Sequence, residues 1–201
     1  MAGESTHLSL VGRVFDGLDD ARLIPLVRAG DAAAYRYLCE VALPLLFQFA
    51  YHIIRSRETA EDAVQTVLAD VWIHRTRFHP SGPLRAYLYR CVRNQLLDTI
   101  DHARVVERAE ETADVEEPYG MGTKPEPADA LAETADTITI VSAAIQQLPE
   151  RQRTAVLLRW YDGMTTAEIA QVMGIARQVA ERLLQKGEVK LRVALHNLRT
   201  E

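Results

Sequence analysis

The stretch Glu58 to Asp98, ETAEDAVQTVLADVWIHRTRFHPSGPLRAYLYRCVRNQLLD, decides the fold, because it places two amphipathic helical patterns around one short break. In residues 58–75 the apolar side chains recur at i, i+3, i+4 and i+7, which predicts a helix with one buried face. The segment 79–83, His-Pro-Ser-Gly-Pro, cannot continue that helix, since each proline lacks a backbone donor and restricts the residue before it. A second helix is predicted to begin near Leu84.

The two predicted helices present chemically different outer faces. The polar side of the first helix carries acidic and neutral polar residues, namely Glu61, Asp62, Gln65, Thr66 and Asp70. The polar side of the second helix is basic, with Arg85, Arg90, Arg93, Asn94 and Gln95. A surface divided in this way predicts two different partners, although the helix pair alone is also compatible with an ordinary helical bundle.

Several short motifs in this stretch resemble region two of the extracytoplasmic-function, or group IV, bacterial sigma factors. They are D-A-V-Q-T-V (62–67), Trp72, Phe78, R-A-Y-L-Y-R-C-V-R-N (85–94) and Asp98. In that family the first helix docks on the RNA polymerase core, and the loop with the second helix opens and reads the minus-ten promoter element. The resemblance implies binding of core polymerase by Asp62, Gln65, Thr66 and Trp72. It implies minus-ten DNA contacts by Phe78, Arg85, Tyr87, Arg90, Arg93 and Asn94.

The segment before this stretch predicts further helices. Residues 1–20 are expected to form a poorly ordered lead-in, followed by a short helix over 21–29 with Pro25 in its first turn. Asp31 is a predicted N-cap for a long apolar helix. Pro44 lies inside that helix and is expected to kink it or split it in two.

The charge is distributed unevenly along the chain. Residues 1–102 hold 11 basic and 12 acidic residues, residues 103–139 hold 3 and 10, and residues 140–201 hold 9 and 6, giving net charges of −1, −7 and +3. The acidity therefore lies in the middle, and the end segments can still bind nucleic acid, which requires local positive potential rather than a basic total. The weak positive charge predicts poor DNA binding by the chain alone.

The middle segment, 107–136, is rich in Glu, Ala, Pro and Gly and poor in large apolar groups. It cannot bury enough surface to offset the entropy of ordering, which predicts a flexible acidic linker. The strongly basic run that the sigma family usually carries after Asp98 is absent here, so phosphate contacts are expected to be weaker at this end. An all-α chain is predicted, with a lead-in over 1–20 and two small helical domains over 21–106 and 137–201.

The helical period returns in the last third of the chain and ends in a helix-turn-helix pattern. Thr165 and Glu168 are placed to form a capping box, and Gly174 supplies the turn between two helices. With L-P-E-R-Q-R (148–153) and L-R-W-Y-D-G-M-T (158–165) before it, this pattern is similar to region four of the same sigma family. That region reads the minus-thirty-five element.

The second helix of this motif is expected to expose a row of polar residues to DNA: Arg177, Gln178, Glu181, Arg182, Gln185 and Lys186. Family members commonly have Ser-x-x-Thr-Val-Lys-Ser-Arg here, whereas this chain lacks the Ser cap and has Glu181 at a position that is commonly basic. A glutamate can accept from cytosine N4, so Glu181 either specifies a base or is an ordinary solvated charge.

The composition, 48% hydrophobic and 25% charged, is that of a soluble globular protein. No apolar run long enough to cross a bilayer and no signal-peptide core are expected, which predicts a cytoplasmic protein without membrane insertion. Cys39 and Cys91 lie in apolar helical patterns and are interpreted as buried thiols. The histidines do not pair at i, i+4, so no metal and no cofactor is predicted.

The leading functional hypothesis is an alternative sigma factor without a catalytic site, whose partners are core RNA polymerase, promoter DNA and, as the resemblance implies, an anti-sigma factor. A free-standing helix-turn-helix regulator that binds an operator as a dimer is the alternative. The lack of a sensor domain and the polar face of 62–72 argue against it. A third class is an enzyme, for which Glu61, Asp62 and Asp70 are the candidate metal ligands. Asp62 and Asp70 do not share a clean helix face, and no phosphate loop accompanies them.

Overall fold

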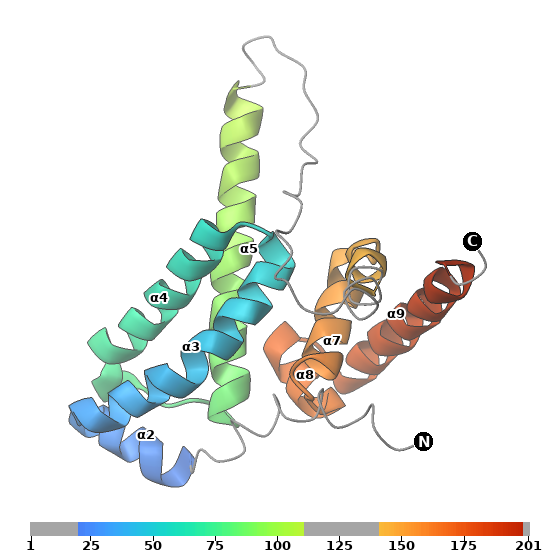
Figure 1. The fold of residues 1–201 in the computed structure, drawn as a ribbon. Helices are drawn as coiled ribbons and strands as arrows, with labels where there is room; N and C mark the ends of the chain where they lie inside the picture. Colours follow the sequence, from blue (N-terminus) through green and yellow to red (C-terminus); the bar gives the residue numbers. More distant parts are fainter. Residues whose placement is uncertain (1–19, 111–140, 199–201) are drawn as a thin grey trace, which may run out of the picture. The chain divides into compact units, whose positions relative to one another are not determined.

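The structure, a computed structural model, describes residues 20–110 and 141–198, with side chains described over 20–102 and 141–195. These parts belong to two compact units, which are considered separately below. All regular elements in the described residues are helical, which confirms the prediction of an all-α chain (Figure 1). The helices are α2 (Asp20–Ala29), α3 (Ala32–Ile54), α4 (Arg57–Ile73), α5 (Leu84–Glu110), α7 (Glu150–Trp160), α8 (Thr166–Met173) and α9 (Arg177–Leu198), with a 3-10 turn, η1 (Arg75–Arg77), after α4.

The N-terminal unit is built around α3, which packs against α2, α4 and α5. The inner side of α3 is apolar. The aliphatic residues of α4 that recur with the helical period pack against it, as predicted. At the centre, the buried rings of Phe49 on α3 and Tyr89 on α5 lie 5.0 Å apart between centroids. The core therefore joins both helices of the stretch 58–98 to α3.

Glycine and aspartate separate α2 from α3, as predicted. Gly30 has a positive φ of 84°, a conformation that glycine adopts without steric cost. The carboxylate of Asp31 then accepts hydrogen bonds from the backbone N–H groups of Ala33 and Ala34, at 2.8 and 3.0 Å. The predicted N-cap is confirmed.

Two prolines lie inside helices. α2 begins at Asp20, so Pro25 lies in its interior and the prediction of a first-turn proline is wrong. α3 is continuous through Pro44, which excludes the predicted split. Both prolines are exposed, and the carbonyl that Pro44 leaves without a helical donor belongs to the exposed residue Glu40. Water can therefore satisfy that carbonyl, and the helix tolerates the proline.

By length and composition alone α3 could cross a membrane, since it has 23 residues and an 18-residue window with a mean hydropathy of 1.4. The expectation that no run reaches that length is wrong for residues 32–54. The apolar residues serve the interior instead, because α3 packs against three other helices and buries Leu38, Leu46 and Phe49. Tyr37 and Leu43 remain exposed on its outer side.

The second helix of the deciding stretch, α5, begins at Leu84 as predicted and continues to Glu110. Residues 107–110, expected at the start of the linker, are therefore helical. The remainder of the predicted linker up to residue 136 and residues 1–19 of the predicted lead-in over 1–20 lie outside the described residues. The last residue of that lead-in, Asp20, is the first residue of α2.

The C-terminal unit consists of a helical segment over 141–146 followed by α7, α8 and α9. α9 packs against both α7 and α8. The contact with α7 is close at Gly187, where an added Cβ would lie 2.7 Å from Cγ2 of Val156. A glycine inside a helix costs stability through backbone entropy, and here its missing side chain permits the approach of the two helices.

Candidate functional site

The outer face of α4 carries three of the four residues predicted to bind core polymerase. Asp62, Gln65 and Thr66 are all exposed, while the opposite side of the helix is buried against α3 and α5. Ile73 lies on the same side as Asp62 and Thr66 two to three turns later, and 64% of its surface is exposed. The sequence analysis missed Ile73, although an isoleucine on the polar side of the helical period is itself a signal.

Trp72, the fourth predicted residue, lies at the edge of this face and is half-buried. Its ring lies 4.7 Å from the ring of Tyr35 on α3, and the Arg75 guanidinium covers it at 4.7 Å. Tyr35 in turn donates a hydrogen bond from its hydroxyl to the carbonyl of Leu68, at 2.8 Å. These contacts give Trp72 a structural role in joining the end of α4 to α3, whatever it binds outside.

Two of the six residues predicted to contact the minus-ten element are buried. Phe78 is 4% exposed and meets Tyr87 edge to face with ring centroids 5.5 Å apart. Arg85 is 8% exposed, and its guanidinium lies 6.0 Å from the ring centre of Tyr89. Arg85 shares its side of α5 with Leu88, because residues three and four apart lie on one face, and that face is buried. Phe78 and Arg85 are therefore less accessible to DNA in this structure than the resemblance implies.

The other four predicted residues remain accessible along α5. Asn94 is exposed, and Tyr87, Arg90 and Arg93 are half-exposed. The Arg90 guanidinium lies 5.7 Å from the centre of the Tyr87 ring, so a cation covers part of that aromatic face. Tyr87 and Asn94 are seven residues apart and therefore lie on one side of the helix.

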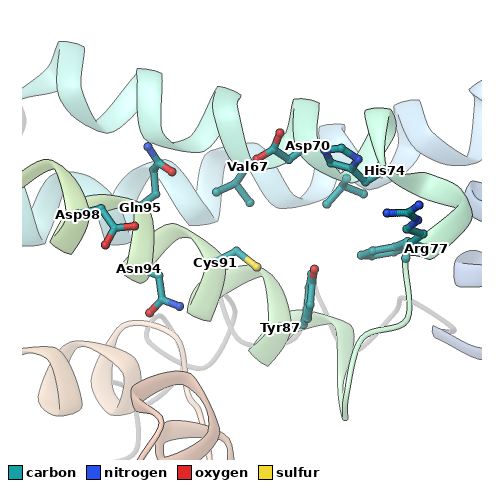
Figure 2. A pocket seen from close by; sticks show the side chains of 11 residues that line it. Val67, Asp70, His74, Arg77, Tyr87, Cys91, Asn94, Gln95 and Asp98 are labelled. Carbon is teal, nitrogen blue, oxygen red and sulfur yellow. The ribbon is translucent and has the colours of Figure 1, made fainter.

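Tyr87 and Asn94 line a groove of about 360 Å³ between α4 and α5. Figure 2 shows the labelled side chains of α4 facing those of α5 across this groove. The residues that line it are Val67, Asp70, Val71, His74, Arg77, Phe78, Tyr87, Cys91, Asn94, Gln95 and Asp98. The groove thus combines an aromatic wall with amide, carboxylate, imidazole and guanidinium groups, a mixture that can hydrogen-bond the edge of a base.

The groove also holds a tyrosine and a thiol that interact. Burial raises the pKa of the Cys91 thiol, and a hydrogen bond with Tyr87 partly opposes that shift. Burial likewise raises the pKa of Tyr87. Both groups are therefore neutral near pH 7. Cys39 and Cys91 are free and half-buried, less enclosed than the predicted buried thiols.

The helix-turn-helix of the C-terminal unit is formed as predicted. The Thr165 N–H donates to Oε2 of Glu168 at 2.8 Å, and the Glu168 N–H donates to Oγ1 of Thr165 at 3.3 Å, which confirms the capping box. Gly174 ends α8 with φ of 63°. The N–H of Ile175 then donates to the carbonyl of Ala170 at 3.0 Å, so the turn is closed by backbone bonds.

α9 exposes all six residues predicted to contact the minus-thirty-five element: Arg177, Gln178, Glu181, Arg182, Gln185 and Lys186. The inner side of the helix is held by Ala180 and Leu184, which are buried. Three of these six side chains are cations and one is a carboxylate. The same face continues into Val189 and Val193, exposed by 60% and 56%, which the sequence analysis did not single out.

Among residues 20–102 and 141–195, no cluster of three or more His, Cys, Asp or Glu side chains could hold a metal ion. The acidic residues of α4 illustrate the reason. Asp62 and Asp70 are eight residues apart on one helix and do not converge.

Comparison with known families gives two matches in chain order. The family described as Sigma-70 region 2 matches residues 38–105, and the family described as Sigma-70, region 4 matches residues 138–191. α4, the loop that follows it and most of α5 fall in the first match. α7, α8 and most of α9 fall in the second.

Several curated proteins resemble nearly the whole chain. The ECF RNA polymerase sigma factor SigL of Mycobacterium tuberculosis is 27% identical over 174 residues, covering 85% of this chain and 93% of SigL. SigW of Bacillus subtilis is 23% identical over 182 residues, covering 87% and 96%. SigM of M. tuberculosis is 28% identical over 181 residues, covering 90% and 87%.

Solved structures share the fold. The sigma factor RpoE of Bartonella quintana, solved in complex with the anti-sigma factor NepR, matches with a TM-score of 0.65 and 20% identity, covering 81% of this chain and 96% of RpoE. CnrH, solved in complex with the cytosolic domain of CnrY, matches with a TM-score of 0.63 and 20% identity, covering 89% and 97%.

Proposed function

Because the chain belongs to the extracytoplasmic-function sigma factors of the sigma-70 family, we propose that its separate exposed faces divide the work of transcription initiation among polymerase binding, promoter opening and promoter recognition. The protein is an alternative sigma factor that directs promoter recognition. The observation that carries the assignment of faces is the exposed polar row on α9, in a helix-turn-helix that follows a region 2 unit in the family's order.

Core RNA polymerase binds the outer face of α4 in this proposal, through Asp62, Gln65 and Thr66, with Trp72 at the edge. Ile73 adds an exposed apolar group to that face. Protein interfaces commonly combine an apolar centre with a polar rim, and this face has both. The buried side of α4 packs on α3 and α5, so docking there requires no rearrangement of the core.

The minus-ten element is opened and held along α5 and the groove. Tyr87 supplies an aromatic surface for a single-stranded base, Asn94 supplies amide groups, and Arg90 and Arg93 supply positive charge. Phe78 and Arg85 serve this site indirectly, since both are buried. Phe78 supports the Tyr87 ring from beside it, and Arg85 packs against Tyr89.

The minus-thirty-five element is read by α9. The basic side chains of this face neutralise phosphates or bind guanine; they are Arg177, Arg182 and Lys186. Glu181 repels nearby negatively charged groups and can accept a hydrogen bond from cytosine N4. With only these few cations, isolated binding is weak. The polymerase supplies the geometry that lets both units engage one promoter and raises the effective concentration of the second contact.

The remaining parts of the proposal concern partners and chemistry. An anti-sigma factor inhibits the protein, as the solved complexes of RpoE with NepR and CnrH with CnrY suggest by analogy of fold. The protein acts as a non-catalytic subunit in the cytoplasm and needs no cofactor or metal. The four predicted segments, 1–20, 21–106, 107–136 and 137–201, are retained with one change: the first helical domain extends over 20–110, because α2 begins at Asp20 and α5 continues to Glu110.

Reconstitution with core RNA polymerase tests the proposal. The purified chain should bind the core and confer specific transcription on a cognate promoter, which the core alone does not transcribe. Gel shifts should show weak, salt-sensitive promoter binding by the isolated chain and tight binding by the holoenzyme. Specific nanomolar binding by the isolated chain in physiological salt, with no affinity for the core, would instead establish a free-standing helix-turn-helix regulator.

A further inference from the structure

The loop that joins α4 to α5 is held by an element far from it in sequence. Oδ2 of Asp20, the first residue of α2, accepts a hydrogen bond from the backbone N–H of Leu84 at 2.8 Å, across 64 residues of chain. Leu84 is the first residue of α5 and is fully buried. Its N–H therefore cannot rely on water and needs a partner from the protein.

The side chain of the preceding residue cannot supply that partner. The residue before Leu84 is Pro83, whose side chain has no hydrogen-bond acceptor, whereas helix N-caps are usually Ser, Thr, Asp or Asn. Asp20 thus acts as an N-cap provided from another helix. Its carboxylate also lies at the positive end of the α5 dipole, where a negative charge is favoured.

The other end of α2 holds the start of the same loop. Gly30, directly after α2, is approached so closely by Arg75 that an added Cβ would lie 3.3 Å from the Arg75 Nε. Arg75 also donates to the carbonyl of Trp72 at 2.9 Å and covers the Trp72 ring. The Arg75 side chain therefore lies between the end of α2 and the end of α4.

We propose that α2 is a brace for the loop 74–83 and that Asp20 is a positioning residue for promoter opening. The two contact points are about 15 Å apart, the length of a ten-residue helix, and they fix both ends of the loop. In Figure 1, α2 lies beside this loop, and α2 packs against η1. Phe78 follows η1, so the brace determines how that ring supports Tyr87.

The brace lies outside the residues that match the sigma-70 region 2 family, which begin at 38. The inference rests on the proposed role of the loop and α5 in promoter opening. It adds that an element outside the polymerase-binding face and outside the groove sets the rate of opening. Asp20 touches neither DNA nor polymerase in this proposal and acts through the N-terminus of α5.

Three variants of the full chain test the brace. Asp20→Ala removes the acceptor, and Asp20→Asn keeps an oxygen that can accept the same bond. Asp31→Ala is the matched control, because the carboxylate of Asp31 also caps a helix but accepts from Ala33 and Ala34 of its own helix. Each variant is measured for hydrogen exchange of the Leu84 amide, for affinity to core polymerase, and for the rate of promoter melting by the holoenzyme.

Asp20→Ala should speed exchange at Leu84 roughly fivefold and slow promoter melting by a similar factor, with unchanged core affinity. Asp20→Asn should restore both. Asp31→Ala should lower thermal stability as Asp20→Ala does but leave Leu84 exchange and melting at the parent values. A parent rate of melting in Asp20→Ala, or an equal loss in Asp31→Ala, would overturn the brace.

A fourth variant distinguishes failure of the brace from failure of the proposed role of α5 in promoter opening. Asn94→Ala alters the proposed groove directly. If Asn94→Ala slows melting and Asp20→Ala does not, the brace alone is wrong. If neither variant slows melting, the proposed role of α5 in opening fails, and the brace fails with it.

Discussion

The two helical units carry their candidate DNA-contacting residues in different ways. In the C-terminal unit all six lie on the exposed face of α9, and a separate inner side holds that helix in place. In the N-terminal unit some of the candidates belong to the core. Phe78 and Arg85 are buried, and the Tyr87 ring packs edge to face against Phe78. Recognition and stability are therefore separable on α9 and coupled around the loop and α5.

The largest expected effect is that of Phe78→Ala, which tests the coupling. Loss of a buried phenylalanine should lower the unfolding free energy of the N-terminal unit by about 3–5 kcal/mol. The chain has two tryptophans, one in each unit, so denaturant unfolding can be followed through Trp72 in a Trp160→Phe background. The exposed Asn94→Ala should cost under about 0.5 kcal/mol. Equal denaturation midpoints for the two variants would contradict the coupling of stability and recognition around the loop and α5.

Gly187→Val tests the inner side of α9 without changing its outer face. A valine there would collide with Val156 and should lower the unfolding free energy of the C-terminal unit by about 1–3 kcal/mol. Trp160 fluorescence in a Trp72→Phe background reports this unfolding. Adding Val156→Ala should recover part of the loss, because the two side chains share one space. Additive losses would show that the collision is relieved elsewhere.

Asp62→Arg extends the comparison to the proposed polymerase-binding face of α4. Reversing this exposed charge should weaken core binding roughly tenfold through altered electrostatic complementarity. It should change the unfolding free energy by less than about 0.5 kcal/mol. Glu40→Arg, an exposed reversal on α3, is the control and should bind the core as the parent does. Unchanged affinity in Asp62→Arg would remove this face from the interface.

The smallest effect on stability is expected for Arg182→Ala, which sharpens the separability of α9. The unfolding free energy should stay within about 0.5 kcal/mol of the parent, since the side chain is exposed. Promoter affinity of the holoenzyme should fall, and the slope of log affinity against log salt should decrease by about 1 if Arg182 contacts one phosphate. A large loss of stability would contradict the comparison, and an unchanged salt slope would contradict the phosphate contact.

Features set by neighbours in sequence could be predicted. Asp31 and the Thr165–Glu168 pair cap their own helices, and the exposed row on α9 follows from helical period alone. Such features depend on side chains three or four residues apart, whose geometry a helix fixes. They account for most of the helices and for the whole candidate face of the C-terminal unit.

Features set by distant contacts could not be predicted. The motifs that include Phe78 and Arg85 gave no sign that the two side chains are buried, because their burial depends on how the loop packs. That packing involves Asp20, 64 residues before its partner. Asp70, His74 and Arg77 join the groove for a similar reason, since α5 must lie opposite α4 before they face anything. Helical period indicates which side is apolar but not what lies across from the polar side.

The bond from Asp20 to Leu84 also has a consequence for synthesis of the chain on the ribosome. At about 5–20 residues per second, Leu84 leaves the exit tunnel roughly 3 to 13 seconds after Asp20 leaves it. During that interval α2, α3 and α4 can emerge and begin to pair, while the acceptor on Asp20 has no donor to meet. The loop can be locked only once α5 has left the exit tunnel. The nascent chain thus acquires the helix that is proposed to bind polymerase before the loop that is proposed to open the promoter is set.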